Sequence, residues 1–207
     1  MGALIQSCSD ESIKAAGQII QGGGLVVYPT DTLYGLGCSA LDDGAVQKTF
    51  AVKKRDLSNP LSIAVCDLRM LRRYTSFDNQ AMQVMECFLP GPVTFILKKR
   101  NLPDVLTGGL ENVGVRIPDN RVALKLIMAA GVPIVSTSAN ISGQASPETA
   151  EEAFEQLPDV DLILDGGRIT GLGSTIIDLT TNPPQILRKG AKPACDIEPV
   201  ITEVYGF

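Results

Sequence analysis

The chain has 207 residues, 44% apolar and 20% charged, which predicts one globular domain and excludes a disordered or fibrous protein. It contains neither histidine nor tryptophan, so no imidazole can serve as base, acid or metal ligand. This excludes Ser-His-Asp triads, Cys-His dyads and most zinc sites. The net charge of −5 argues against a protein that binds nucleic acid over its whole surface.

The cysteines indicate free thiols in a reducing compartment. They are odd in number and far apart, so they support neither a disulfide framework nor a CxxC ligand pair: Cys8, Cys38, Cys66, Cys87 and Cys195. We expect Cys38 to be a packed small side chain. There is no signal peptide pattern, and the longest apolar stretch, at 126–135, is too short to span a bilayer. We therefore expect a cytoplasmic protein with no membrane partner.

Hydrophobic periodicity predicts alternating helices and strands with no internal repeat or linker. The first half of the chain predicts a helix at 13–20 that starts behind Ser9 and Asp10 and ends at three glycines, a strand at 25–28, a helix at 43–54 capped by Asp42, a strand at 61–65, and helices at 68–74 and 79–88. Strands at 93–98 and 113–117, a helix at 121–130 and a strand at 133–136 follow. The last part predicts a helix at 147–157 with Pro147 in its first turn, and strands at 161–164, 175–179 and 185–188. The pattern predicts the α/β class, with a mixed sheet flanked by helices. Ligands of such folds usually bind beyond the strand ends.

The charges are unevenly distributed along the chain. Positions 53–125 hold 12 Lys/Arg and 7 Asp/Glu, whereas positions 148–165 hold seven acids and no base. The first region would attract a polyanion, and the second would repel it. Ordinary solvated faces explain the same distribution.

The first candidate site is the segment YPTDTLYGLG at 28–37, where a buried strand runs into a loop rich in hydroxyls and glycines. Binding groups often lie on loops at strand ends. If the backbone stays extended, Thr30 and Thr32 point to one side and Asp31 to the other. Two hydroxyls would then hold a small polar substrate, although a hydroxyl-stabilised turn fits these residues equally well.

The second candidate site is KKRDLSNP at 53–60, where the predicted helix ends in three cations. Lys53 and Arg55, two positions apart at an exposed helix end, would converge on a phosphate chain. Cations at a helix C-terminus also complement the helix dipole, and the residues alone favour that simpler explanation.

The third candidate site is STSANISG at 136–143, the polar end of an apolar strand. In an extended backbone Ser136, Ser138 and Asn140 share one face and would form a polar site. A polar strand end followed by a turn is the alternative. The segments at 165–175 and 186–190 are weaker candidates, in which glycines allow close backbone approach and Arg188 would reach a phosphate. No GxxxxGK(S/T) P-loop occurs, so scattered side chains must hold any nucleotide.

Taken in order, these segments resemble the YrdC/TsaC family of threonylcarbamoyl-AMP synthases. The matching blocks run from about Gly22 to Gly190: YPTDTLYGLG, KKR followed by NPL, LPGPVTFIL, VGVRIP, STSANISG and DGG…GST…ILRKG. Six blocks in the family order are far more specific than any one of them. The resemblance implies a single YrdC-like domain over residues 1–207, a twisted mixed sheet flanked by helices around a concave polar groove, without an extra C-terminal domain.

The resemblance also implies a reaction. L-threonine, bicarbonate and ATP would give threonylcarbamoyl-AMP and pyrophosphate, with Mg²⁺ on the phosphates and no protein metal ligand identified. This is the first step of threonylcarbamoyladenosine formation in tRNA, so downstream tRNA threonylcarbamoyl-transfer proteins would be partners. Positioning and charge neutralisation dominate such chemistry, and the absence of histidine is therefore no obstacle.

The family's K-x-R and S-x-N signature matches four residues, which the resemblance assigns to ATP and the reacting centre: Lys53, Arg55, Ser138 and Asn140. Further ATP contacts correspond to Asn59, Ser146 and Arg188, and the threonine contacts to Thr32, Arg116, Ser138 and Ser174. A guanidinium such as that of Arg116 matches the fork of a ligand carboxylate.

Two positions depart from the family pattern. Ala64 and Asn120 stand where many members have a histidine near the threonine site. Both changes resemble the YciO-like branch, which leaves open a nucleotide-binding paralogue with a different acyl or amino-acid substrate. A double-stranded RNA-binding module is the non-enzymatic alternative.

Overall fold

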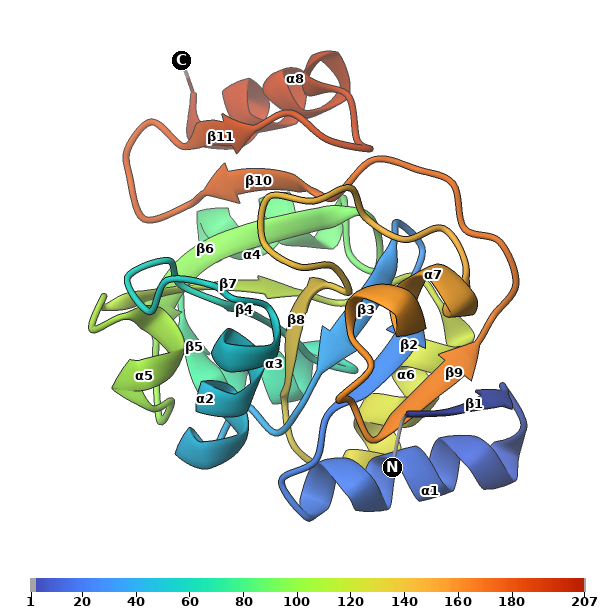
Figure 1. Ribbon diagram of the computed structural model, residues 1–207. Helices are drawn as coiled ribbons and strands as arrows, with labels where there is room; N and C mark the ends of the chain where they lie inside the picture. The colour runs from blue at the N-terminus through green and yellow to red at the C-terminus, as the bar shows by residue number, and fades with distance from the viewer. Residues whose placement is uncertain (1–2, 207) are drawn as a thin grey trace.

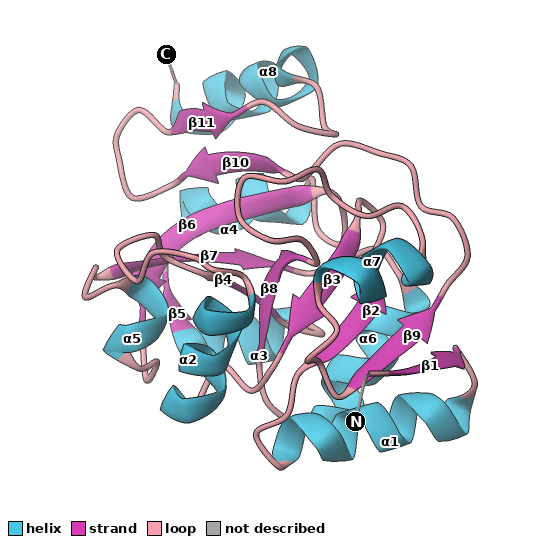
Figure 2. Cartoon of the chain, in the orientation of Figure 1, coloured by secondary structure: helices cyan, strands magenta, loops and turns pink. Residues whose placement is uncertain are grey.

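The computed structural model describes residues 3–206 and shows one mixed sheet running through the molecule (Figure 1). The strands are β1 (Leu4–Ser7), β2 (Val26–Pro29), β3 (Tyr34–Gly37), β4 (Ser62–Ala64), β5 (Thr75–Ser76), β6 (Val93–Lys99), β7 (Asn112–Arg116), β8 (Ile134–Ser138), β9 (Leu162–Asp165), β10 (Thr175–Asp178) and β11 (Gln185–Arg188). The helices are α1 (Asp10–Gln21), α2 (Asp43–Val52), α3 (Leu68–Tyr74), α4 (Asn79–Glu86), α5 (Asp104–Thr107), α6 (Arg121–Ala130), α7 (Ala150–Gln156) and α8 (Ala194–Tyr205). The predicted α/β class is confirmed, and helices surround the sheet (Figure 2).

The strand order is β1-β9-β2-β3-β8-β4-β7-β6-β10-β11, with β5 paired to β6. The pairs β1–β9, β9–β2, β4–β7 and β6–β10 are parallel, and the other neighbouring strands pair antiparallel. The strand β8 is antiparallel to β3 on one side and to β4 on the other. Because the strands on either side of β8 come from different stretches of the chain, β8 joins the two halves of the sheet.

The helices α1 and α6 pack together against β2 and β9, at the end of the sheet opposite α8 (Figure 1). The sequence explains this packing, because Ile13, Ala16 and Ile20 recur at helical spacing and are buried. Gly17 lies at the contact, where an added Cβ would sit 2.7 Å from Cβ of Ala129. A small residue at this position lets the two helices approach closely.

Most predicted elements are confirmed. The helices at 68–74 and 121–130 and the strand at 185–188 have the predicted bounds, and Ser9 caps α1 by accepting a hydrogen bond from the backbone N–H of Ser12. The helix predicted at 147–157 begins later, at Ala150, because the Thr149 hydroxyl caps it, so Pro147 is not in its first turn. The helix predicted at 43–54 ends at Val52.

The sequence did not predict β1, β3, β5, α5 or α8. Glycine is unfavourable in strands, yet β3 contains Gly35 and Gly37. Both lie against the Tyr28 ring on β2, where a Cβ at Gly37 would be 2.9 Å from a ring carbon. The helix α8 contains Pro199, a residue that usually marks a helix end. No helix in residues 3–206 has the length and hydropathy needed to cross a membrane.

The α1–α6 contact gives a prediction for stability. Gly17→Ala should lower the free energy of unfolding by about 1–3 kcal/mol, because the new methyl group overpacks the backbone and side chain of Ala129. The control is Gly44→Ala, another helical glycine, where the nearest atom is a side-chain oxygen of Asp42 at 3.3 Å. Gly44→Ala should raise the free energy of unfolding by up to about 1 kcal/mol, because alanine favours the helix and meets no clash there. Urea unfolding of both variants checks this, and equal effects would contradict the packing argument.

Candidate functional site

A groove of about 780 Å³ opens over the strands on both sides of β8. Seven of the ten site residues implied by the family resemblance line it: Thr32, Arg55, Arg116, Ser138, Ser146, Ser174 and Arg188. They come from segments spread over more than 150 positions, and the fold brings them to one surface. Three others, Lys53, Asn59 and Asn140, are not part of the lining.

The floor of the groove is polar because short side chains alternate along its strands. Ser62 on β4 lies opposite Ser136 on β8, and Thr94 on β6 also faces the groove. Gly114 on β7 leaves room for the Ser62 side chain, since a Cβ at Gly114 would come within 2.3 Å of the Ser62 hydroxyl. The expected concave polar groove is therefore present.

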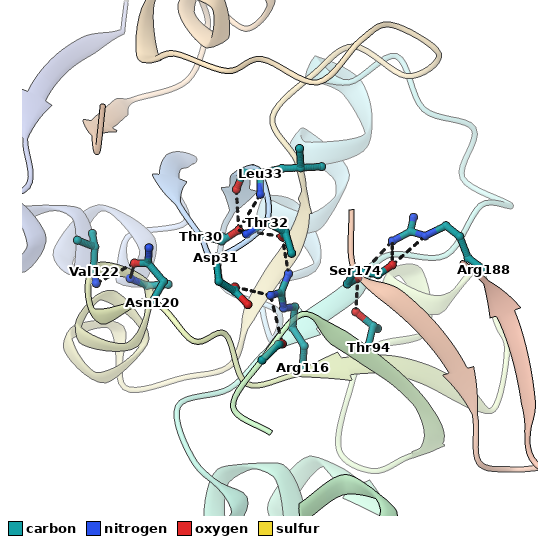
Figure 3. Close-up of polar contacts among 12 residues, drawn as sticks. Thr30, Asp31, Thr32, Leu33, Thr94, Arg116, Asn120, Val122, Ser174 and Arg188 are labelled. Carbon is teal, nitrogen blue, oxygen red and sulfur yellow. Dashed lines mark hydrogen bonds and ion pairs between the residues drawn. The ribbon is translucent and has the colours of Figure 1, made fainter. Parts of the chain in front are cut away.

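Arg116 is held in place by the YPTDTLYGLG segment (Figure 3). Its side chain is nearly buried; Nη1 donates to the Thr32 hydroxyl at 3.0 Å and Nη2 forms an ion pair with Asp31 Oδ1. The Thr30 hydroxyl accepts hydrogen bonds from the backbone N–H groups of Thr32 and Leu33, both at 3.1 Å. The segment is therefore a hydroxyl-stabilised turn, and the expectation that Asp31 and Thr32 point to opposite sides is wrong: both meet Arg116.

The Asp31–Arg116 pair keeps unused hydrogen-bonding capacity. Within residues 3–206, Nε of Arg116 and Oδ2 of Asp31 have no hydrogen-bond partner, although both atoms are buried. Buried polar atoms usually have partners, because an unpaired one loses its hydration without compensation. The two side chains are thus fixed in orientation, but each still has one buried atom that could form a hydrogen bond with a ligand.

A second guanidinium approaches the groove from β11. Nε and Nη2 of Arg188 donate to the Ser174 carbonyl at 3.1 and 2.7 Å, and the Ser174 hydroxyl shares a 2.7 Å hydrogen bond with Thr94 (Figure 3). Burial and then the positive charge of Arg116 lower the pKa of Arg188. An anionic ligand beside Arg188 would favour its charged form.

The expectation that Lys53 lies at an exposed helix end is wrong. Lys53 follows the last residue of α2, and its side chain turns inward and is 1% exposed. Its Nζ donates to the carbonyls of Ser138 and Asn140, the latter at 2.6 Å. Burial and then the charge of Arg55 lower the pKa of Lys53 to about 8.

Arg55 faces the groove as expected and is only partly buried. Its Nε donates to the Asn59 carbonyl and its Nη2 to the Pro60 carbonyl, each at 3.0 Å. These two carbonyls fix the guanidinium from one side. The exposed Asn59 thus contacts Arg55 through its main chain.

Asn140 does not extend the face formed by Ser136 and Ser138. The strand β8 ends at Ser138 and the chain bends at 139–140, so Ser136, Thr137 and Ser138 line the groove while Asn140 is buried behind it. The expected shared face of Ser136, Ser138 and Asn140 is therefore wrong, because it assumed an extended backbone through the bend.

The positions that depart from the family pattern lie outside the groove lining. Ala64 is 1% exposed in the core formed with α1 and α6. Asn120 caps α6, where its Oδ1 accepts from the backbone N–H groups of Val122 and Ala123 at 2.9 and 3.1 Å (Figure 3). Cys38 is fully buried, its Sγ lies 3.2 Å from the Thr49 hydroxyl, and burial raises its pKa to about 12, as fits a packed side chain.

Several groove residues were not singled out from the sequence: Ser62, Thr94, Glu111, Asn112, Asp178 and Lys189. Ser62, Thr94 and Asp178 are single polar residues between apolar neighbours, which gives no motif. The available signal is alternation, since Thr94 lies between the buried residues Val93 and Phe95.

Comparison with known proteins identifies the family. The family model Sua5/YciO/YrdC, described as telomere recombination, matches residues 18–190. The chain belongs to this family. It is 42% identical over 196 residues to the threonylcarbamoyl-AMP synthase of Pyrococcus abyssi, which covers 93% of this chain and 58% of that protein.

Solved structures of the same family have the same fold. The structure of P. abyssi Sua5 complexed with L-threonine matches with a TM-score of 0.92 and 40% identity, over 97% of this chain and 60% of that one. Escherichia coli YciO matches with a TM-score of 0.85 and 31% identity, over 94% of this chain and 97% of that one. The chain thus spans about three fifths of the Pyrococcus proteins and nearly the whole of YciO.

The buried ion pair leads to a prediction. Asp31→Asn should lower the free energy of unfolding by about 3 kcal/mol, because it leaves the nearly buried Arg116 without its counter-charge. The control is Asp104→Asn, which removes an ion pair whose carboxylate is 83% exposed and should cost less than about 1 kcal/mol. Denaturant unfolding of the two variants measures both changes, and similar values would show that the buried pair has no special role.

Proposed function

We propose that this chain forms threonylcarbamoyl-AMP and pyrophosphate from L-threonine, bicarbonate and ATP, the first step of threonylcarbamoyladenosine modification of tRNA. The observation that carries the proposal is the groove itself, in which Arg55, Arg116 and Arg188 converge over a floor of hydroxyl groups. The 42% identity to a protein named threonylcarbamoyl-AMP synthase and the likeness to a Sua5 complex with L-threonine support it.

The groups in the groove suit the triphosphate of ATP and the carboxylate of threonine. Arg55 and Arg188 would neutralise the triphosphate, with Ser138 and Ser146 as further contacts. Asn59 lies outside the lining and would act by holding Arg55 through its carbonyl. The carboxylate of threonine would bind near Arg116, beside Thr32 and Ser174. Such an arrangement places the threonine end next to the Asp31–Arg116 pair and the phosphates toward β11 and the 53–60 segment.

The chemistry needs positioning more than proton transfer. The amine of threonine and bicarbonate give a carbamate and water, and a carbamate oxygen then attacks the α-phosphorus of ATP. The bond from that phosphorus to the β-phosphate oxygen breaks, and pyrophosphate leaves with the electron pair. Fixed guanidinium and hydroxyl groups stabilise the charge that develops on the phosphate oxygens. This accounts for a site without histidine.

Mg²⁺ would be held mainly by the phosphates. No group of three or more His, Cys, Asp or Glu side chains within residues 3–206 is arranged to bind a metal ion. Mg²⁺ in nucleotide sites commonly uses one or two carboxylates together with phosphates and water. The described side chains therefore do not form a metal site without the nucleotide. A cytoplasmic location and transfer of the product to tRNA by other proteins complete the proposal.

A YciO-like paralogue with another amino-acid or acyl substrate is the second candidate function. Ala64 and Asn120 favour it, since one lies in the core and the other caps a helix, and neither contributes to the groove. E. coli YciO also matches this chain over nearly its whole length. The two candidates use the same nucleotide site and differ in the amino-acid end of the groove.

The proposal predicts a threonine-dependent product. Mass spectrometry of the protein with ATP, Mg²⁺, bicarbonate and threonine should detect threonylcarbamoyl-AMP, with little product from serine or without an amino acid. Arg55→Gln should reduce turnover by about 100-fold, because it removes a charge beside the phosphates. Arg72→Gln, an exposed arginine of α3 outside the groove, should leave turnover unchanged. Adducts with other substrates but not threonine would favour the paralogue.

The amino-acid end of the groove can be tested separately. Thr32→Val should raise the KM for threonine about tenfold, which corresponds to about 1.4 kcal/mol, because Arg116 loses the hydroxyl that accepts from its Nη1. The dissociation constant of ATP should stay the same. Steady-state kinetics and ATP titration measure the two quantities, and equal losses of both would count against this assignment.

A further inference from the structure

The two ends of the sheet differ in how they are protected against pairing with another chain. The strand β1 is the outer strand at one end and β11 at the other. Prolines and charged side chains protect an edge strand. Pro183 and Pro184 precede β11, and Arg188 and Lys189 end it. The sequence of β1, LIQS, contains neither a proline nor a charge, so β1 is the unprotected edge of the two.

The outer edge of β1 is continuous and partly apolar. The strand pairs with β9 in unbroken register, from Leu4 opposite Leu162 to Ser7 opposite Asp165, so no bulge bends it. Leu4 is 57% exposed and Ile5 is 37% exposed. Within residues 3–206 no strand lies on the outer side of β1, where alternate residues of an edge strand direct their N–H and C=O groups. The ligand that fits such an edge is another strand.

An open notch of about 530 Å³ is bordered by β1 and the first turns of α1 (Figure 1). Its lining residues are Gln6, Ser7, Ser9, Glu11, Ser12 and Ala15. Glu11 and Ala15 are one turn apart and so share one face of α1. The Ser7 carbonyl accepts from the backbone N–H of Ser9 at 2.9 Å and from the Ser12 hydroxyl, which holds α1 against β1. A partner at this edge would therefore meet a strand and a helix in a fixed arrangement.

We propose that β1 and α1 form an interface with a second copy of this chain, in which the two β1 strands pair antiparallel about a twofold axis. Such an axis, perpendicular to the sheet, joins the two sheets into one and places the two α1 helices side by side on the same face. The second copy supplies a strand for the free edge and a helix for the notch. A peptide strand from another protein would occupy the edge and leave the notch open.

The charges at this edge allow two copies to meet. The strand β1 carries none, and the acidic residues of α1, Asp10 and Glu11, lie in its first turn. Antiparallel helices bring each first turn beside the other end of the partner helix, where Gln18 and Gln21 are uncharged. Ala15, near the middle of α1, is small and lets the two helices approach. Two copies thus avoid like charges, whereas an acidic peptide or a nucleic acid would meet Glu11.

This interface leaves the ligand groove open. The strands β9, β2 and β3 separate β1 from β8. None of the residues that line the notch also lines the groove. The inference therefore does not depend on the proposed function.

The oligomeric state tests the inference. Sedimentation velocity should show a monomer–dimer equilibrium with a dissociation constant on the order of 10 µM, because the paired strands are short. Ile5→Lys should raise this constant about tenfold or more, since it places two like charges beside the twofold axis. Ala15→Glu should have the same effect through the helices. Met128→Lys adds the same charge at a 59% exposed residue of α6, outside the interface, and should leave the constant unchanged.

Hydrogen exchange of the native chain identifies the surface without any variant. The backbone amides of β1 should exchange about fivefold more slowly at about 300 µM than at about 1 µM, while those of β11 should not change. A dimer that persists in both interface variants, or one without added protection of β1, would overturn the inference. A chain that stays monomeric up to about 300 µM would also overturn it, and would leave β1 to a strand of another protein.

Discussion

The antiparallel pairing of β8 with both β3 and β4 is the constraint on which the groove depends. It joins two halves of the sheet that otherwise share no hydrogen-bonded strand pair within residues 3–206. The apolar start of β8 is buried, while its polar end opens into the groove. A polar strand end that enters the interior must find partners for its carbonyls, because unpaired buried carbonyls are destabilising. Lys53 supplies those partners, which explains why a lysine is almost completely buried here.

The charges around the groove are only partly compensated by the protein. Asp31 neutralises Arg116, whereas Arg55 and Arg188 donate to carbonyls and have no ion pair within the described residues. Burial first, and then the charge of Arg116, lower the pKa of Arg188. A negatively charged ligand beside Arg188 would favour its charged form, and a neutral ligand would not. The groove thus contains one guanidinium with a counter-charge from the protein and two without one among the described residues.

Local sequence patterns predicted the helices and strands whose own residues carry the periodicity and the end signals of that element. The helix α6 has apolar residues at helical spacing, a capping Asn120 and a terminal Gly131, and its bounds follow from these alone. The strand β3 could not be predicted, because its glycines are required by the Tyr28 ring of the paired strand, a contact between elements. The site shows the same division. The composition of its three segments indicated which parts of the chain form the groove, but the bends at 31–33 and 139–140 decide which side chains face it.

The two bends also explain how a site without histidine can be specific. The first brings Thr32 and Asp31 to the same guanidinium, and the second turns Asn140 away so that Ser138 is the last side chain of β8 in the groove. Guanidinium and hydroxyl groups keep one protonation state near neutral pH, so their contribution depends on where they are held. A site of this kind gains selectivity from the rigidity of its turns. Buried residues behind the groove, such as Lys53, are then as important for the site as those that line it.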